Sequence, residues 1–282
     1  MSTLTTTIEK LHTEEFMYIS AFIQEHYGIQ LPVTKKMMVE ARLQKRLKTL
    51  NMVTFQDYFD FVFSSAGRNE YQQMIDLLTT NKTDFFRESN HFDFLAEGIL
   101  PKLLKNQQDK LQFWSAASST GEEVYSILIT LEEYFLRALR KIPYTILGTD
   151  LSMQVLQKAA RAVYDEDRME NIPLYIKKRY LLKNKDRQNP KARIKPEFLE
   201  AVEFKRLNLL KEFRGIDFNY DVIFCRNVLI YFNREVQQEV VTKLASRLKT
   251  GGYLFIGHSE SLTNMQLPLR QVKPTIYQKI EA

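Results

Sequence analysis

Residues 111–123 have the sequence LQFWSAASSTGEE, which combines an apolar run, a series of small residues and a pair of acids. The apolar run predicts a buried strand, and the small residues after it predict a turn that ends at Gly121, where a helix begins. With one glycine, the turn differs from the GxGxxG pattern of dinucleotide-binding sites, and Glu122 and Glu123 would repel phosphate groups. These acids either complement the dipole of the helix or suit a positively charged ligand, such as a sulfonium. By itself the turn leaves both interpretations open.

Strands and helices alternate after this turn. Further strands are predicted at 144–147, 202–205, 221–225, 253–257 and 275–279. Helices separate most of them, and the clearest is predicted at 233–248, closed by Gly251 and Gly252. This alternation predicts an α/β fold with a mostly parallel, doubly wound sheet.

The chain before the first strand is predicted to be helical. Apolar residues recur at three- and four-residue steps there, without strand alternation. A polar, basic stretch at 165–200, which contains three prolines, interrupts the later alternation of strands and helices. Its apolar residues favour a small inserted subdomain over a linker.

The composition is that of an ordinary globular protein, with 44% hydrophobic and 26% charged residues among 282. No apolar run approaches the roughly 20 residues that span a bilayer, and the Thr-rich start lacks the apolar core of a secretory signal. The single cysteine, Cys225, excludes an intrachain disulfide and a cysteine-based zinc cluster. We therefore expect a cytoplasmic protein. The net charge of +6 suits nucleic acid or an acidic protein surface.

Asp150 ends the second predicted strand, about thirty residues after the glycine turn. An acid at this place can hydrogen-bond the hydroxyls of a ribose, or it can cap the next helix together with Ser152. Turn and acid together indicate a nucleoside-containing cofactor. The two acids in the turn and the missing glycines favour S-adenosylmethionine (SAM) over a nicotinamide dinucleotide.

Residues 221–232, DVIFCRNVLIYF, predict an apolar strand that ends in Arg226 and Asn227, with the Tyr231 hydroxyl following. Polar side chains at the carboxyl end of a buried strand stand at the ligand crevice. An ion pair between Arg226 and a neighbouring acid is the structural alternative. We interpret Cys225 as a core residue, because no base that would activate its thiol is apparent nearby.

Four motifs in the same order resemble those of CheR-type chemotaxis protein methyltransferases. They are LTTNKTDFFRE at 78–88, WSAASSTGEE at 114–123, FCRNVLIYF at 224–232 and GHSE at 257–260. The motifs lie between residues 78 and 260, and the resemblance that they carry extends over nearly the whole chain, so it is specific. It implies an N-terminal helical domain and linker at 1–98 and a Rossmann-like SAM-dependent methyltransferase domain at 99–282, with a small inserted antiparallel β-subdomain at 165–200.

The resemblance also implies the reaction, which is methyl transfer from SAM to glutamate side chains of chemoreceptors (methyl-accepting chemotaxis proteins). The products are glutamate 5-O-methyl esters, used in sensory adaptation, and S-adenosylhomocysteine (SAH). Family contacts to the cofactor carry over to Asn81, Thr83, Arg87, Glu123, Asp150, Asn208, Leu209, Arg226 and Asn227.

Arg87 and Tyr231 are the expected catalytic residues. We hypothesise that Arg87 steers the substrate carboxylate, while Tyr231, which matches a family tyrosine near the transferred methyl, orients it. A glutamate side chain has a pKa of about 4.3, so it is already a nucleophile at neutral pH and needs no general base. Catalysis would come from aligning oxygen, methyl carbon and sulfur for in-line displacement. No metal is expected.

The partner implied by the resemblance is the cytoplasmic helical domain of chemoreceptors. Arg42, Lys45 and Arg46 lie on one face of a predicted basic helix and are expected to guide docking to it through long-range attraction. In some relatives the β-subdomain binds a receptor C-terminal pentapeptide by strand addition. Those relatives carry glycines in a loop that matches 183–188, where this chain has none, which puts tether binding in doubt but not catalysis. We expect a monomer without membrane insertion.

Three other functions compete with this one. A regulatory SAM-binding protein without turnover would not need Arg87 and Tyr231. An RNA methyltransferase would suit the basic balance, but its usual Asn/Asp-Pro-Pro-Tyr/Phe motif is absent. A nicotinamide-dependent dehydrogenase fits the turn least well. We therefore expect no nucleic acid as partner.

Overall fold

The computed structural model describes residues 8–105, 109–216 and 219–281, which form two compact units. The first unit holds the chain up to Thr80 together with Tyr231–Asn233, and the second holds the rest. The predicted domain boundary between residues 98 and 99 stays a prediction.

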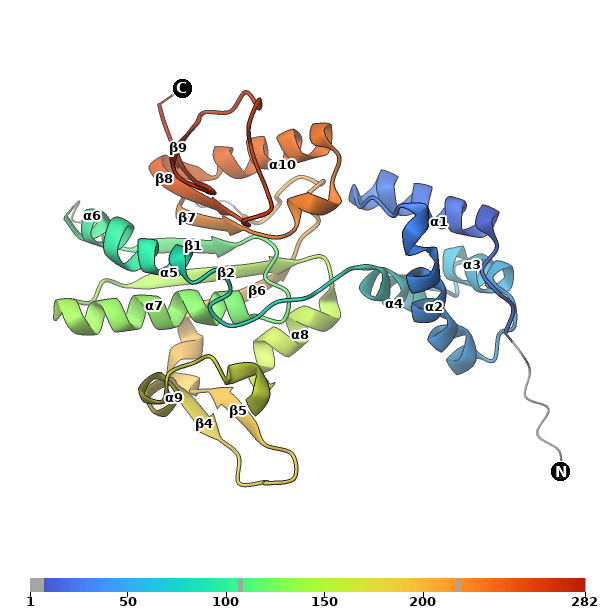
Figure 1. The fold of residues 1–282 in the computed structure, drawn as a ribbon, viewed down its shortest axis with the longest axis horizontal. Coiled ribbons are helices and arrows are strands. Elements are labelled where there is room, and N and C mark those ends of the chain that lie inside the picture. The colour runs from blue at the N-terminus through green and yellow to red at the C-terminus, as the bar shows by residue number, and fades with distance from the viewer. Residues whose placement is uncertain (1–7, 106–108, 217–218, 282) are drawn as a thin grey trace. The chain divides into compact units, whose positions relative to one another are not determined.

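The first unit is helical (Figure 1). Its elements are α1 (Thr13–Tyr27), the 3₁₀ turn η1 (Val33–Lys35), α2 (Lys36–Leu50), α3 (Phe55–Phe63) and α4 (Arg68–Leu78). Gly28 ends α1 with a φ of 71°, a left-handed conformation that glycine adopts without strain. Thr54 begins α3, because its hydroxyl accepts a hydrogen bond from Asp57 N at 3.1 Å. One face of each helix is buried, as the apolar spacing predicts.

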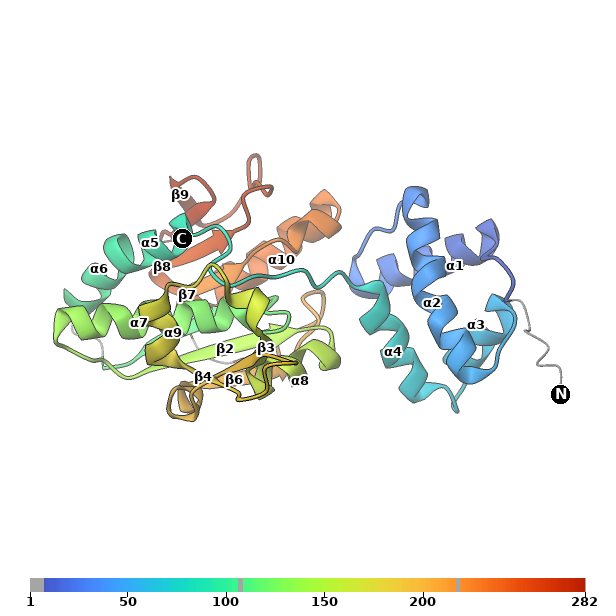
Figure 2. The same cartoon turned by 60° about the horizontal axis from the view of Figure 1, so that its bottom comes forward.

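The second unit is built on a seven-stranded sheet in the order β6-β2-β1-β7-β8-β10-β9 (Figures 1 and 2). The five strands from β6 to β8 are parallel, whereas β10 is antiparallel to both of its neighbours. The strands are β1 (Leu111–Ser115), β2 (Tyr144–Asp150), β6 (Val202–Arg206), β7 (Tyr220–Cys225), β8 (Leu248–Ile256), β9 (Leu269–Lys273) and β10 (Ile276–Lys279). The predicted Rossmann-like α/β class is confirmed.

Helices accompany this sheet and bury both of its faces. They are α5 (Asn90–Phe94), the π-helical turn η2 (Leu95–Ile99), α6 (Leu100–Lys105), α7 (Glu122–Ala138), α8 (Met153–Arg161) and α10 (Arg234–Ser246). Val222 and Phe224 of β7 join the core that contains α5, α6 and α7, while Ile223 and Cys225, which alternate with them, are buried on the opposite face. Burial raises the pKa of the Cys225 thiol well above its usual value, so its interpretation as a core residue holds.

A small antiparallel sheet, β3-β5-β4, is inserted between β2 and β6 and is yellow in Figure 1. The inserted segment comprises β3 (Val163–Asp165), η3 (Glu166–Met169), α9 (Leu174–Tyr180), β4 (Leu181–Lys183), β5 (Lys191–Ile194) and η4 (Pro196–Ala201). Tyr164 and Tyr180 anchor it in the same core as α7. The predicted inserted antiparallel β-subdomain is confirmed.

One predicted boundary is wrong. The helix expected at 233–248 ends at Ser246, and the glycines expected to close it lie inside β8. Leu248 is buried and pairs with Tyr220, so sheet pairing determines its conformation. Gly251, with a φ of 80°, allows the chain to bend within the strand. Among the described residues, no helix is long and apolar enough to cross a membrane.

Candidate functional site

The candidate site lies where β1, β2 and β7 end. β1 stands between β2 and β7, and the chain runs outward through β2 and β6 before it returns to β7 on the other side of β1. Strand order therefore reverses at β1, and ligands of open parallel sheets bind beyond the carboxyl ends of the strands at such a point. Ser115, Asp150 and Arg226 stand at or directly after these three strand ends.

The turn after β1 is held against the end of β2. Ser119 N donates a hydrogen bond to Asp150 Oδ2 at 2.9 Å. Gly121 has a φ of 95°, and a Cβ at this position would lie 2.9 Å from the Tyr164 hydroxyl. The glycine is therefore required both for the backbone conformation and for the close approach of its neighbours.

Asp150 anchors the turn and also the start of α8. Its Oδ1 accepts a hydrogen bond from Ser152 N at 3.0 Å, and the Ser152 hydroxyl caps α8 by accepting from Val155 N at 3.3 Å. The structural and the cofactor-binding interpretations of Asp150 do not exclude each other. A carboxylate has about four lone-pair sites, so this anchoring is compatible with bonds to ribose hydroxyls.

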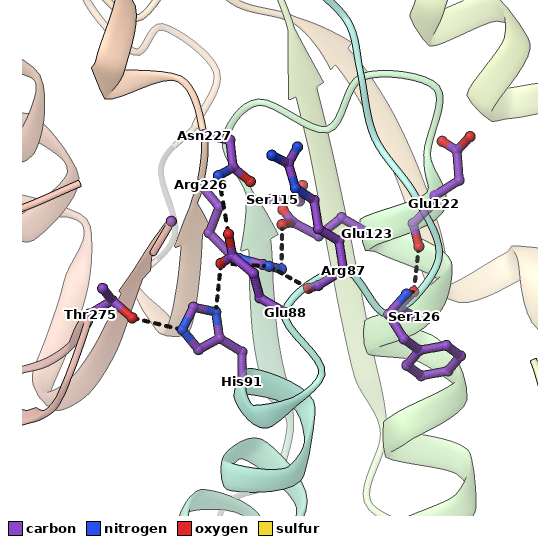
Figure 3. A network of polar contacts seen from close by, with 12 residues as sticks. Arg87, Glu88, His91, Ser115, Glu122, Glu123, Ser126, Arg226, Asn227 and Thr275 are labelled. Atoms are coloured by element: carbon purple, nitrogen blue, oxygen red, sulfur yellow. Dashed lines mark hydrogen bonds and ion pairs between the residues drawn. The ribbon is translucent and has the colours of Figure 1, made fainter. Parts of the chain in front are cut away.

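Arg226 joins two acids across the sheet edge (Figure 3). Its Nη1 lies 3.1 Å from Glu123 Oε2, and its Nη2 lies 3.0 Å from Glu88 Oε2. Ser115 Oγ donates to Glu123 Oε1 at 2.7 Å, and Asn227 Nδ2 donates to Glu88 Oε1 at 3.2 Å. The segment before α5, the start of α7 and the ends of β1 and β7 are thus tied into one polar network.

The network contains more acid than base. Burial raises the pKa of Glu88, but Arg226 and the hydrogen bond from Asn227 outweigh it, so the net shift is downward. Burial dominates at Glu123 and raises its pKa, with Arg226 and Ser115 opposing the shift. The Arg226 side chain, 2% exposed, is shared between both acids. A ligand with a positive charge is therefore favoured beside them.

His91 lies against this network and is neutral. Burial, followed by the charge of Arg226, lowers its pKa to about 3. Thr275 Oγ1 donates to Pro274 O at 2.7 Å, so it accepts from His91 Nε2, which lies 2.8 Å away. The buried Nδ1 lies 3.6 Å from Glu88 Oε2, beyond hydrogen-bond distance.

Glu88, His91 and His258 bring three possible metal-ligand atoms within 4.8 Å of one another. However, the Glu88 oxygens already accept hydrogen bonds from Arg226, Asn227 and the His258 backbone N–H. We therefore interpret the three residues as part of the polar network.

The segment that carries three predicted cofactor contacts lies along the turn. Asn81 O accepts from Ser119 Oγ at 2.8 Å, and Thr83 O accepts from Arg168 of the inserted subdomain. Arg87 O accepts from Arg226, while its own Nη1 donates to a backbone carbonyl of the same segment at 3.1 Å.

The structure brings most of the predicted cofactor contacts to one edge of the sheet. Asn208 and Leu209 follow β6, the neighbour of β2. Asn208 Oδ1 accepts from Leu210 N at 3.0 Å, and Leu209 is buried. The cofactor roles of all nine residues stay predictions.

The two predicted catalytic residues fall in different units. Arg87 belongs to the second unit, whereas Tyr231, at the end of the 3₁₀ turn η5 (Leu229–Tyr231), groups with the first. Within the first unit, the Lys35 ammonium lies 5.2 Å from the centre of the Tyr231 ring. The joint catalytic role of Arg87 and Tyr231 stays a prediction.

The basic helix is α2, where two of the three predicted docking residues make internal bonds. Arg42 donates to two backbone carbonyls near the end of α4. Arg46 forms a bidentate pair with the buried Glu70, at 2.8 and 2.6 Å. Lys45 is exposed, and so is Lys48. The docking role stays a prediction, but its exposed charge lies on the lysines.

The sequence did not indicate Glu88, His91 and Arg168 as members of the site's surroundings, whereas Glu122 was named with Glu123 in the turn. Arg168 Nη2 lies 2.8 Å from Oε1 of Glu122, which is 1% exposed. Burial raises the pKa of Glu122, and its hydrogen bond with Thr120 and the charge of Arg168 oppose the shift. Glu88 stood inside a motif, and an acid beside Arg87 was the available signal. No sequence signal indicated Arg168, because it lies in the polar insertion.

Two family profiles match the chain. The profile described as "CheR methyltransferase, all-alpha domain" matches residues 14–79, and "CheR methyltransferase, SAM binding domain" matches residues 81–278. A "Chemotaxis protein methyltransferase" of Borreliella burgdorferi is 38% identical over 270 residues, which cover 94% of each chain. "Chemotaxis protein methyltransferase 2" of Pseudomonas aeruginosa is 37% identical over 94% of this chain and 92% of its own. The Escherichia coli "Chemotaxis protein methyltransferase" is 34% identical over 95% and 91%.

Proposed function

Because the chain belongs to the CheR methyltransferase family, we propose that it methylates glutamate side chains of chemoreceptors with SAM as methyl donor, forming glutamate 5-O-methyl esters. Membership confirms the resemblance seen in the four motifs, and the chain is a SAM-dependent methyltransferase with a SAM-binding domain. The relatives are named as chemotaxis protein methyltransferases, which supports a chemoreceptor as the substrate.

The site's residues fit SAM. The small side chains of the turn after β1 would let a ligand lie against the backbone, and Asp150 places a carboxylate where it would hold the ribose hydroxyls. The acids around Arg226 favour the positive charge of a sulfonium and an ammonium group. SAM supplies an electrophilic methyl group on its sulfonium. Asn81, Thr83, Asn208, Leu209 and Asn227 would complete the contacts.

The acceptor needs no base from the protein, since a glutamate with a pKa of about 4.3 is ionised at neutral pH. This agrees with the titratable groups near Arg226, where His91 is neutral and buried and Cys225 has a raised pKa. In the proposed mechanism Arg87 attracts the incoming carboxylate and Tyr231 orients it. The chain's contribution is alignment and exclusion of water from the reacting atoms.

The proposed partner is the cytoplasmic helical domain of a chemoreceptor, so we place the reaction in the cytoplasm and treat the enzyme as a monomer. The exposed lysines of α2 would favour approach to an acidic helix bundle. The single observation that carries the proposal is the match of both family profiles over nearly the whole chain.

The test is incubation of the purified chain with methyl-labelled SAM and receptor cytoplasmic fragments, followed by alkaline release of methanol. We expect label in the fragment, base-labile release, and loss of both in Arg87→Ala. Fragments with glutamine in place of the acceptor glutamates serve as the control. SAH binding without methanol release would support a regulatory protein, and label that resists alkali would contradict ester formation.

A further inference from the structure

Glu260 ends the GHSE motif, whose chemistry the proposed function leaves unexplained. Its side chain is buried, with the residue 7% exposed, and its two oxygens accept four backbone hydrogen bonds. Oε1 accepts from Leu229 N at 2.7 Å and from Ile230 N at 3.3 Å. Oε2 accepts from Asn227 N at 3.0 Å and from Gly257 N at 2.5 Å. One carboxylate therefore holds the chain after β7 and the chain after β8.

The backbone after β7 needs such a partner, because it leaves the sheet abruptly. Asn227 has a φ of 57°, a left-handed conformation, and the next residues begin the turn η5. N–H groups that leave a ladder in this way need an acceptor from elsewhere where they are shielded from water, as Leu229 N is fully and Asn227 N is partly. The approach is close, since a Cβ on Gly257 would fall 2.4 Å from Asn227 Nδ2. Gly257 thus leaves room for Asn227, whose backbone N–H is held by Glu260.

Asn227 is held at its side chain as well. Its Nδ2 donates to Glu88 Oε1 at 3.2 Å, and His258 N donates to the same oxygen at 3.2 Å. The amide orientation is thereby fixed, with the side-chain carbonyl directed away from Glu88. Asn227, a predicted cofactor contact, therefore has its backbone held by Glu260 and its side chain held by Glu88.

We propose that Glu260 is a positioning residue for cofactor binding, which fixes the conformation in which Asn227 contacts SAM. The proposal rests on the proposed function, because it takes Asn227 as a cofactor contact. Glu260 acts through the backbone and touches neither the donor nor the acceptor. Loss of the Glu260 carboxylate therefore lowers the affinity for the cofactor and leaves the affinity for the receptor nearly unchanged.

The test compares Glu260→Gln with Asp221→Asn. A glutamine presents an amide NH₂ to two of the four backbone donors, so two hydrogen bonds are lost. Asp221 is a matched control, since it is 2% exposed, accepts from Gln112 N at 2.8 Å, and lies at the opposite end of β7. Kd for SAH and KM for SAM and for the receptor fragment are measured in each variant.

We expect Glu260→Gln to raise both Kd for SAH and KM for SAM by about tenfold or more, with KM for the fragment nearly unchanged. Asp221→Asn should leave all three constants unchanged, although it lowers stability. In an Asn227→Ala background, Glu260→Gln should add little, because the side chain that Glu260 positions is absent. Equal SAH affinities in Glu260→Gln and Asp221→Asn would overturn the proposal. So would a double variant, Asn227→Ala with Glu260→Gln, whose loss of affinity is the product of the two single losses.

A measurement on the wild-type chain covers the case in which Glu260→Gln does not fold. The amides of Asn227, Leu229, Ile230 and Gly257 should exchange slowly with deuterium, and rapid exchange of these four would reject the positioning role. Glu260→Asp, which is too short to reach both chain segments, should give a smaller loss of SAH affinity in the same direction. Wild-type protein without SAH affinity would instead contradict the proposed function.

Discussion

Arg226 Nη1 lies 3.1 Å from Glu123 Oε2, so the residue that follows β7 is joined to the first turn of α7 across the edge of the sheet. The same guanidinium pairs with Glu88, which precedes α5 by two residues. An arginine shared between two acids fixes three segments with one rigid, planar group. Most of the residues expected to contact SAM lie on or beside these segments.

Arg226→Ala should destabilise the chain by about 3 kcal/mol, because it leaves two largely buried acids without their cation. Urea unfolding monitored by circular dichroism measures this loss. Lys205→Ala removes one partner of an exposed ion pair with Glu203 and should change stability by less than about 0.5 kcal/mol. Similar losses in the two variants would show that Arg226 is not an essential cation.

His91 should make the folded chain sensitive to acid. Its pKa is lowered to about 3, so below the ordinary value of about 6.5 the unfolded state binds a proton that the folded state does not. Stability therefore falls on acidification, by about 1.6 kcal/mol between roughly pH 6.5 and pH 5 from this group alone. Urea unfolding of the wild type and of His91→Gln at both pH values measures the effect. Equal pH dependence in the two proteins would mean that His91 titrates normally.

Arg168→Ala should weaken the attachment of the inserted subdomain to the site. It removes the 2.8 Å pair with buried Glu122 and the hydrogen bond to Thr83 O. Because Arg168 is 39% exposed, we expect a loss of about 1 kcal/mol, well below that for a fully buried pair. Lys183→Ala, which removes an exposed pair with Glu166 in the same subdomain, is the control. The prediction fails if both variants unfold at the wild-type urea concentration.

Charge reversal at Lys45 and Lys48 should raise KM for the receptor fragment, and the effect should shrink at high salt because exposed charges are screened. These lysines give a cleaner test than Arg42 and Arg46, which make bonds inside the first unit. Steady-state methylation at low and high salt is the measurement. Reversal of Lys102 and Lys105 on α6 matches the charge change, and an equal effect there would remove any special role of α2.

Sequence patterns predicted the alternating fold because its strands are apolar and its turns contain small residues, as at 111–123. They missed β9, whose residues Leu269–Lys273 are mostly polar and exposed. They also misplaced the end of α10, because pairing of Leu248 with Tyr220 takes precedence over the closing signal of Gly251. In each case partners distant in the chain determine the structure.

The sequence predicted which residues belong to the site better than it predicted which of them contact one another. Arg226 and Asn227 were identified from their place after a buried strand. Their partner Glu88 lies 138 residues from Arg226, a separation at which periodicity carries no information about contact. The family motifs contained Glu88 and Glu260, and only the folded chain gives these acids their partners.

Calorimetric titration of SAH into the wild type, Asp150→Asn and Asp221→Asn tests whether the methyl donor binds at the carboxyl ends of the parallel strands. Asp150 ends β2 at the proposed site, whereas Asp221 lies near the start of β7, at the amino-terminal ends of the parallel strands. We predict one SAH per wild-type chain, an affinity lower by about tenfold or more in Asp150→Asn, and wild-type affinity in Asp221→Asn. Wild-type affinity in Asp150→Asn, or no binding by the wild type, would contradict a methyl donor held at the carboxyl ends of β1, β2 and β7.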